Sequence, residues 1–221
     1  MTRLLLLHGY TEDRTIFDTL LPRLPAFDQI VALELEEECA HWWPAGPVNV
    51  ATLASHLTAR HRIGPADVLI GHSMGGWIAA HVKEQTGATA ILLSSFTDQA
   101  KVVSRIRSPR LLGLYAHLGL VQNRWLNEYF RRRYRHDESR ALHGQLVAGM
   151  ARLSRRYMAQ QLRVLFAPVP PLSTQPELRL HALNDTVVRP PAEPFVELPG
   201  DHFAHYFYPE LAAAAIRSLL G

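Results

Sequence analysis

Short apolar runs alternate with segments of helical period along the first hundred residues. The apolar runs predict buried strands at residues 4–7, 29–33, 68–70 and 90–93. Apolar residues at helical spacing predict helices at residues 16–24, 50–61 and 77–85. The acidic residues 34–38 are expected to form a connector rather than an element. Strands and helices that alternate in this order predict a parallel sheet.

The pattern changes after the fourth predicted strand. Residues 97–161 lose the strand signal, and their leucines, aromatic residues and arginines recur at helical spacing, which predicts two to four helices. Two further strands are predicted at residues 178–183 and 194–198, followed by a closing helix at residues 206–220. The chain is therefore expected to form one α/β domain with a helical insertion at residues 97–161.

Composition agrees with one packed domain in a reducing compartment. The chain has 221 residues, of which 48% are hydrophobic and 19% charged, values typical of a globular protein. A single cysteine, Cys39, cannot form an internal disulfide. The apolar run at residues 4–7 is too short for a secretory signal, and no run reaches the roughly 18 apolar residues of a membrane span. We therefore expect a cytoplasmic protein without a membrane span.

The charge is distributed unevenly along the chain. Residues 99–163 hold thirteen arginines and one lysine against three acidic residues, whereas the remainder of the chain is net acidic. A basic segment of this kind attracts phosphates, acidic proteins or anionic surfaces.

The clearest chemical motif lies between a predicted strand and a predicted helix. Residues 71–75 read Gly-His-Ser-Met-Gly, which matches the pattern Gly-x-Ser-x-Gly. Glycines on both sides of Ser73 permit a sharp strand-to-helix turn that projects the serine hydroxyl. We therefore predict that Ser73 is a nucleophile, with Gly71 and Gly75 supporting its turn.

A serine nucleophile needs a base, and the base needs an acid that orients it. His202 follows the last predicted strand, so it is expected at the same sheet edge as the serine. Asp185 follows the preceding strand and is the first choice for the acid, with Asp98 as the alternative. His205 is expected at a helix start, and Asp201 is expected to stabilise its loop.

Backbone N–H groups can stabilise the negative charge that develops on a carbonyl oxygen. His8, Gly9 and Tyr10 follow the first strand, and Gly9 permits the chain to turn back toward the serine. The N–H groups of Tyr10 and Met74 are the predicted pair of oxyanion donors.

Together these segments resemble the α/β-hydrolase fold. The segments similar to its oxyanion, nucleophile, acid and histidine loops are residues 8–10, 71–76, 183–185 and 200–203. The resemblance implies a mostly parallel sheet of about six strands flanked by helices, an acyl-enzyme on Ser73, proton transfer by His202, and no metal or organic cofactor. One feature departs from the family: only seven residues separate Asp185 from Glu193, too few for the usual helix before the last strand.

The resemblance also gives the basic insertion a role. An insertion at residues 97–161 corresponds to the helical cap that selects the substrate in this family. The arginines predicted to bind an anion or an acidic carrier protein are Arg124, Arg131, Arg132, Arg133 and Arg135. In charge and position they are similar to the arginines of pimeloyl-acyl-carrier methyl ester carboxylesterase lids, and a solvated helix face is the alternative. No recognised nucleic-acid motif accompanies them, so a nucleic-acid partner is not expected.

The sequence thus predicts a serine hydrolase that cleaves a small carboxylic ester. One alternative is a carrier- or coenzyme-linked ester or thioester hydrolase, and another is a non-catalytic ligand-binding protein on the same fold. Lactonases, lyases and carbon–carbon bond hydrolases use the same residue types, so the fold alone does not name the reaction.

Overall fold

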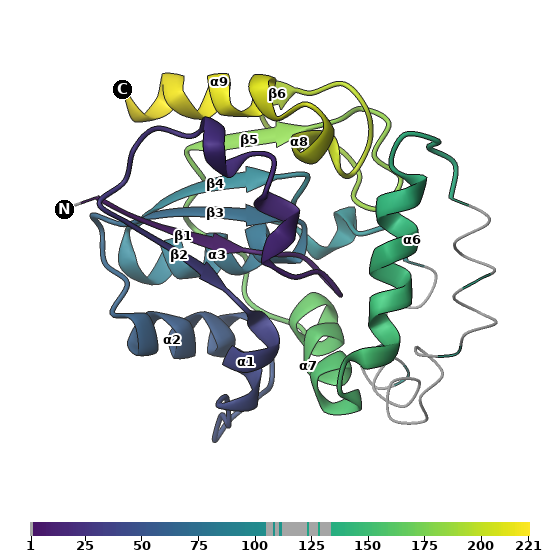
Figure 1. Ribbon diagram of the computed structural model, residues 1–221. Helices are drawn as coiled ribbons and strands as arrows, with labels where there is room; N and C mark the ends of the chain where they lie inside the picture. Colours follow the sequence, from purple (N-terminus) through teal and green to yellow (C-terminus); the bar gives the residue numbers. More distant parts are fainter. Residues whose placement is uncertain (1, 105–107, 109–110, 112–122, 124–127, 129–133) are drawn as a thin grey trace.

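A six-stranded parallel sheet forms the centre of the protein. The computed structural model describes all residues except 1, 105–107, 109–110, 112–122, 124–127 and 129–133. The sheet order is β2-β1-β3-β4-β5-β6, and each pairing is parallel. The strands are β1 (Arg3–Leu7), β2 (Gln29–Leu33), β3 (Val68–His72), β4 (Thr89–Leu93), β5 (Leu178–His181) and β6 (Val196–Glu197). Their carboxyl ends therefore meet at one edge, where the arrowheads point in Figure 1.

The apolar run of β1 is explained by burial on both faces of the sheet. Leu5 and Leu7 belong to the core on one face, and Leu4 and Leu6 belong to the core on the other. Side chains alternate along a strand, so a central strand needs apolar residues at consecutive positions.

Helices cover both faces of this sheet (Figure 1). The core on one face contains residues of α1 (Leu35–Ala40), α2 (Val50–His61), α3 (Met74–Thr86) and α7 (Arg155–Phe166). The core on the other face contains residues of the 3-10 turn η1 (Arg14–Phe17), α8 (Ala204–Phe207) and α9 (Pro209–Leu220). The remaining short turns are η2 (Leu21–Arg23), η3 (Gln99–Lys101) and η5 (Met150–Arg152).

Helix α6 (Arg140–Gly149) lies across the carboxyl edge of the sheet (Figure 1). The segment before it is tied to the loop after β6, because the hydroxyls of Tyr134 and Ser139 both donate to Asp201 Oδ2. Leu142 and Leu146 of α6 pack against the core on the α9 side of the sheet. A substrate-selecting cap at residues 97–161 stays a prediction, because much of this range lies outside the described residues.

The parallel sheet of six strands flanked by helices that the sequence predicts is confirmed, and three local predictions are wrong. Residues 34–38 are not a connector, since α1 begins within them at Leu35, whose side chain is buried. The apolar spacing over residues 16–24 forms two 3-10 turns and no α-helix. The closing helix is divided at Tyr208, after which Pro209 starts α9 because proline fits the first turn of a helix.

Candidate active site

Ser73 occupies a strained turn between β3 and α3. Its backbone angles are φ 51° and ψ −118°, a region that costs a non-glycine residue about 1–3 kcal/mol. The surrounding structure holds this conformation, since Ser73 N donates to Leu93 O at 3.0 Å and Ser95 Oγ donates to Ser73 O at 2.5 Å. The turn places Ser73 at the carboxyl edge of the sheet, in front of the first turn of α3.

The glycines beside the serine are needed because main chains approach closely there. A Cβ atom on Gly75 would overlap the carbonyl oxygen of Leu7, and one on Gly71 would overlap the backbone of Gly75. The nucleophile turn is therefore packed directly against the end of β1, which brings the loop after β1 beside Ser73.

His202 and Asp185 lie in hydrogen-bond contact at the same edge. His202 Nδ1 is 2.7 Å from Asp185 Oδ2, and the two side chains are 4% and 0% exposed. Burial would raise the pKa of Asp185, but the His202 charge and hydrogen bonds from His181, His202 and Val188 outweigh it and hold that pKa far below its usual range. An ionised Asp185 accepts a hydrogen bond from Nδ1–H of His202, which leaves Nε2 free to act as a base.

A tight turn, rather than a helix, places Asp185. Its backbone N donates to Ala182 O at 3.2 Å, and its Oδ1 accepts from Val187 N at 2.8 Å and Val188 N at 2.9 Å. This turn takes the place of the helix that the short segment before β6 cannot form.

The alternative acid and the alternative base are engaged elsewhere. Asp98 is exposed and accepts from Ala100 N at 2.8 Å at the start of η3. Asp201 accepts from Phe203 N at 3.0 Å and from Tyr134 Oη at 2.8 Å. His205 lies in α8, where burial holds its pKa well below the usual histidine value. Asp185 is thus the carboxylate that the structure brings to His202.

A neutral histidine holds the loop of the first predicted oxyanion donor. Burial lowers the pKa of His8, and its Nε2 lies 3.0 Å from Leu35 N, so Nε2 accepts and Nδ1 carries the proton. That proton points at Gly9 O, 3.0 Å away. Because a peptide unit is planar and trans, anchoring the Gly9 carbonyl turns the N–H of Tyr10 to the opposite side.

The second predicted donor starts a helix. Met74 is the first residue of α3, so its N–H has no acceptor within the helix. Gly9 lies close to Ser73, since a Cβ atom built on it would be 3.0 Å from Ser73 Cβ. The structure therefore brings the Tyr10 and Met74 segments together around Ser73.

Sequence reasoning missed three buried polar residues around this site. Glu12 contacts both Gly9 N and His72 Nδ1, His181 Nε2 lies 3.3 Å from Asp185 Oδ2, and Gln161 Oε1 accepts from Thr11 N at 2.9 Å. Each contact joins residues that are distant in the chain or separated by a turn, and no local motif marks them. The one signal was Gln161 itself, a polar residue on the apolar face of α7.

The arginines predicted to bind an anion are mostly outside the described residues. Arg124, Arg131, Arg132 and Arg133 fall in that part, and Arg135 is exposed. A different group of arginines lines a cavity of about 600 Å³ between α7 and the loop after α1. We call this cavity the α7 groove, and the cationic residues that line it are Arg155, Arg156 and Arg163.

Neither a metal site nor a membrane-spanning helix is found in the described part of the chain. No group of three or more His, Cys, Asp or Glu residues there is arranged to hold a metal ion. Every helix found in the same residues is too short or too polar to cross a lipid bilayer.

Comparison with known proteins decides the family. A sequence model described as "Alpha/beta hydrolase family" matches residues 4–216. The chain belongs to this family. A comparison with curated protein sequences finds no significant match.

Solved α/β hydrolases share the fold at low sequence identity. An enol-lactonase from Burkholderia xenovorans LB400 superposes with a TM-score of 0.74 and 14% identity over 99% of this chain and 91% of the other. An esterase from Rhodococcus sp. ECU1013 gives 0.62 and 18% over 99% and 90%. The RedJ thioesterase from Streptomyces coelicolor gives 0.56 and 20% over 99% and 83%. At these identities the likeness extends to the fold, and the protein is a hydrolase by family.

Proposed function

We propose that the protein hydrolyses a carboxylic ester through an acyl-enzyme on Ser73. The observation that carries this proposal is the 2.7 Å contact between His202 and Asp185 at the sheet edge that also holds the Ser73 turn. A base oriented by a buried carboxylate beside a serine on a strand-to-helix turn is the arrangement that acyl transfer requires.

The proposed reaction has two halves. Ser73 Oγ attacks the ester carbonyl while His202 Nε2 takes the hydroxyl proton, and the N–H groups of Tyr10 and Met74 stabilise the oxyanion. His202 then gives this proton to the leaving alkoxide, and the ester carbon stays bound to Ser73. In the second half water gives a proton to His202 Nε2 and attacks the acyl carbon. The bond between this carbon and Ser73 Oγ then breaks, His202 returns the proton to Oγ, and the carboxylic acid leaves.

The contact between Ser73 and His202 is itself part of the proposal. Among the described residues no hydrogen bond from Ser73 Oγ is present, and such catalytic contacts commonly tighten only when substrate binds.

A series of p-nitrophenyl esters with acyl chains of increasing length tests the proposal. We expect hydrolysis by the wild type and loss of at least about 10³-fold in kcat for Ser73→Ala, since residual rates come from binding and oxyanion contacts alone. Folded protein that neither hydrolyses these esters nor reacts with a fluorophosphonate would favour the non-catalytic ligand-binding alternative.

The α7 groove favours a second candidate, an ester or thioester hydrolase whose substrate carries an anionic coenzyme or carrier. Arg156 Cζ lies 3.3 Å from the centre of the Trp43 ring, and Arg156 Nη2 donates to Trp42 O at 3.2 Å. This guanidinium is therefore held in place, while Arg155 and Arg163 lie on the same face of α7. Guanidinium groups beside an exposed indole suit an anion with a planar apolar portion.

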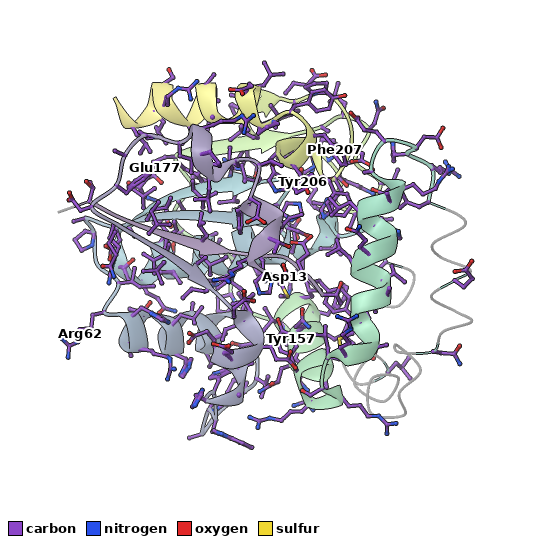
Figure 2. All side chains as sticks on the ribbon, viewed as in Figure 1. Asp13, Arg62, Tyr157, Glu177, Tyr206 and Phe207 are labelled. Carbon is purple, nitrogen blue, oxygen red and sulfur yellow. The ribbon has the colours of Figure 1, made fainter. Side chains whose placement is uncertain are left out.

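Charge reversal at the groove separates the two candidates. We expect the double variant Arg155→Glu/Arg163→Glu to raise KM for butyryl-coenzyme A at least about tenfold, because a charge-assisted hydrogen bond contributes about 1.5–3 kcal/mol. KM for p-nitrophenyl butyrate should stay unchanged. Arg62→Glu is the control, since Figure 2 shows Arg62 at the left edge of the molecule, away from Tyr157 of α7. Equal effects on both substrates would indicate that the groove arginines form a solvated surface and do not bind the substrate.

A further inference from the structure

A buried acid–histidine pair joins the loops that carry the proposed catalytic groups. Glu12 lies in the loop after β1, and its Oε2 accepts from Gly9 N at 2.6 Å. The same oxygen is 2.8 Å from Nδ1 of His72, the last residue of β3. The other ring nitrogen of His72 is 3.0 Å from the backbone oxygen of His202. The side chains of Glu12 and His72 are 3% and 0% exposed, so bulk solvent does not reach them.

The hydrogen-bond partners of His72 determine where one proton of this network lies. A carbonyl oxygen only accepts, so Nε2 of His72 carries a proton that it donates to His202 O. One more proton lies between Nδ1 and the carboxylate. Burial would lower the pKa of His72, but the charge and hydrogen bond of Glu12 outweigh burial and raise it. Burial would likewise raise the pKa of Glu12, but the charge and hydrogen bond of His72 outweigh burial and lower it.

The other titratable groups around the pair are consistent with an imidazolium–carboxylate pair. The ring of His72 lies 4.4 Å from the His205 ring and 4.8 Å from the His202 ring, centre to centre. Burial and, after it, the charges of His72 and His202 lower the pKa of His205. The negative charge of Asp185 contributes to the raised pKa of His72. His205 thus stays neutral, and Glu12 balances the charge of His72.

The contacts of this pair reach the oxyanion loop, the Ser73 turn and the His202 loop. Glu12 holds the N–H of Gly9, which precedes the oxyanion donor Tyr10. His72 precedes Ser73 in the chain and holds the carbonyl of His202. We propose that Glu12 and His72 are positioning residues, which hold the main chain of His202 and of the oxyanion loop in place against the Ser73 turn. This inference rests on the proposed function of Ser73 and His202.

A role in stability alone would not need these contacts. Buried ion pairs add little net stability compared with apolar residues of the same volume, because both charges lose their hydration. Their directional hydrogen bonds, in contrast, fix backbone atoms to a few tenths of an ångström, and a misplacement of about 1 Å in an active site can cost roughly 10²-fold in rate.

Two substitutions at Glu12 separate the contact to His72 from the contact to Gly9. Because the same oxygen, Oε2, makes both contacts, Glu12→Gln can keep only one of them: with its NH₂ group at this position it donates to Nδ1 of a neutral His72 and no longer accepts from Gly9 N. Nε2 of His72 then still donates to His202 O, so we expect kcat to fall about tenfold, less than when both contacts are lost. Glu12→Ala removes both contacts, and we expect kcat to fall about 10²-fold with KM within about threefold. Rates are measured on p-nitrophenyl acetate and divided by the number of sites that react with a fluorophosphonate.

Asp67→Ala is the matched control for stability. Asp67 forms an ion pair with Arg3 at 2.6 Å at the opposite end of β1. We expect this variant to lower the melting temperature and to leave kcat per reactive site unchanged. If Glu12→Ala does not fold, the double variant Glu12→Gln/His72→Phe removes the contact to His202 without leaving a buried charge, and it should show the same loss of kcat.

Histidine nitrogen NMR gives a readout that does not depend on turnover. We expect both ring nitrogens of His72 to be protonated in the wild type and only Nε2 in Glu12→Gln. Absence of a proton on Nε2 in the wild type, or unchanged kcat in Glu12→Ala, overturns the inference while the proposed function stands. If the wild type gives the expected NMR signature but shows no turnover that depends on Ser73, the proposed function has failed. The pair then has no role in catalysis either.

Discussion

Replacing Asp185 by asparagine tests the proposed orientation of the base most sharply. In the structure, Asp185 Oδ1 accepts from the backbone N–H groups of Val187 and Val188, while Oδ2 faces His202 Nδ1 at 2.7 Å and His181 Nε2 at 3.3 Å. An asparagine that keeps the two backbone contacts must direct its NH₂ group at both histidines. His202 can then be bound only as the tautomer with its proton on Nε2.

This tautomer cannot accept the proton of Ser73. The same substitution in a serine-protease triad lowers kcat by about 10⁴-fold, which corresponds to about 5.5 kcal/mol in activation free energy. The geometry around Asp185 predicts a loss of this order here, because the carboxylate is buried and its two backbone contacts prevent the amide from turning over. Stability should fall much less, by about 1.5–3 kcal/mol for the weakened charge-assisted contacts.

The assay is kcat for p-nitrophenyl acetate per fluorophosphonate-reactive site, with melting temperatures measured in parallel. Asp98→Asn is the control, because asparagine can replace aspartate as a helix cap with little change in stability. The Asp98 side chain accepts from Ala100 N as the cap of η3. We expect its kcat within about twofold of wild type. An Asp185→Asn variant within tenfold of wild type, or a larger loss in Asp98→Asn, would refute the assignment of the acid.

Three further predictions concern stability and reactivity. Gly75→Ala should prevent stable folding, because the new Cβ atom would overlap the Leu7 carbonyl oxygen. Gly149→Ala in α6 places its Cβ atom in open space and should raise the free energy of unfolding by about 0.5–1 kcal/mol. Chemical denaturation measures both effects. Burial lowers the pKa of His81 to about 4, so between about pH 6.5 and 4 the unfolded chain binds more protons than the folded protein. The free energy of unfolding should therefore drop by up to about 3 kcal/mol as the pH falls through this range. His81→Leu should flatten this pH dependence. Burial raises the pKa of Cys39 to about 12, so iodoacetamide at pH 8 should alkylate this thiol only after the protein is unfolded, and rapid native-state alkylation, seen by mass spectrometry, would contradict its burial.

The parts of the fold that local sequence determines could be predicted. Continuous apolar residues at 4–7 require a strand covered on both faces, and glycines on both sides of Ser73 permit the tight turn that the structure contains. The 12-residue helix Val50–His61 was predicted from its apolar spacing with its observed bounds, and the structure shows a capping box of Asn49 and Thr52 at its start.

The features that failed depend on distant contacts. Leu35 lies next to acidic residues that look like a connector, yet its burial against the sheet makes them a helix. The Glu12–His72 pair joins residues 60 positions apart, and His72 reaches His202 over a further 130. A single sequence contains no local pattern for such pairs, so they follow only once the strand order is known.

The central claim is that Ser73 is the nucleophile of a hydrolase. The most direct measurement is mass spectrometry of the intact protein and its peptides after reaction with a fluorophosphonate, on wild type and Ser73→Ala. We predict one adduct per chain on Ser73 in the wild type, a pH-dependent labelling rate, and no adduct in Ser73→Ala. Folded wild type that takes up no label, or an adduct on another residue that persists in Ser73→Ala, would contradict the account.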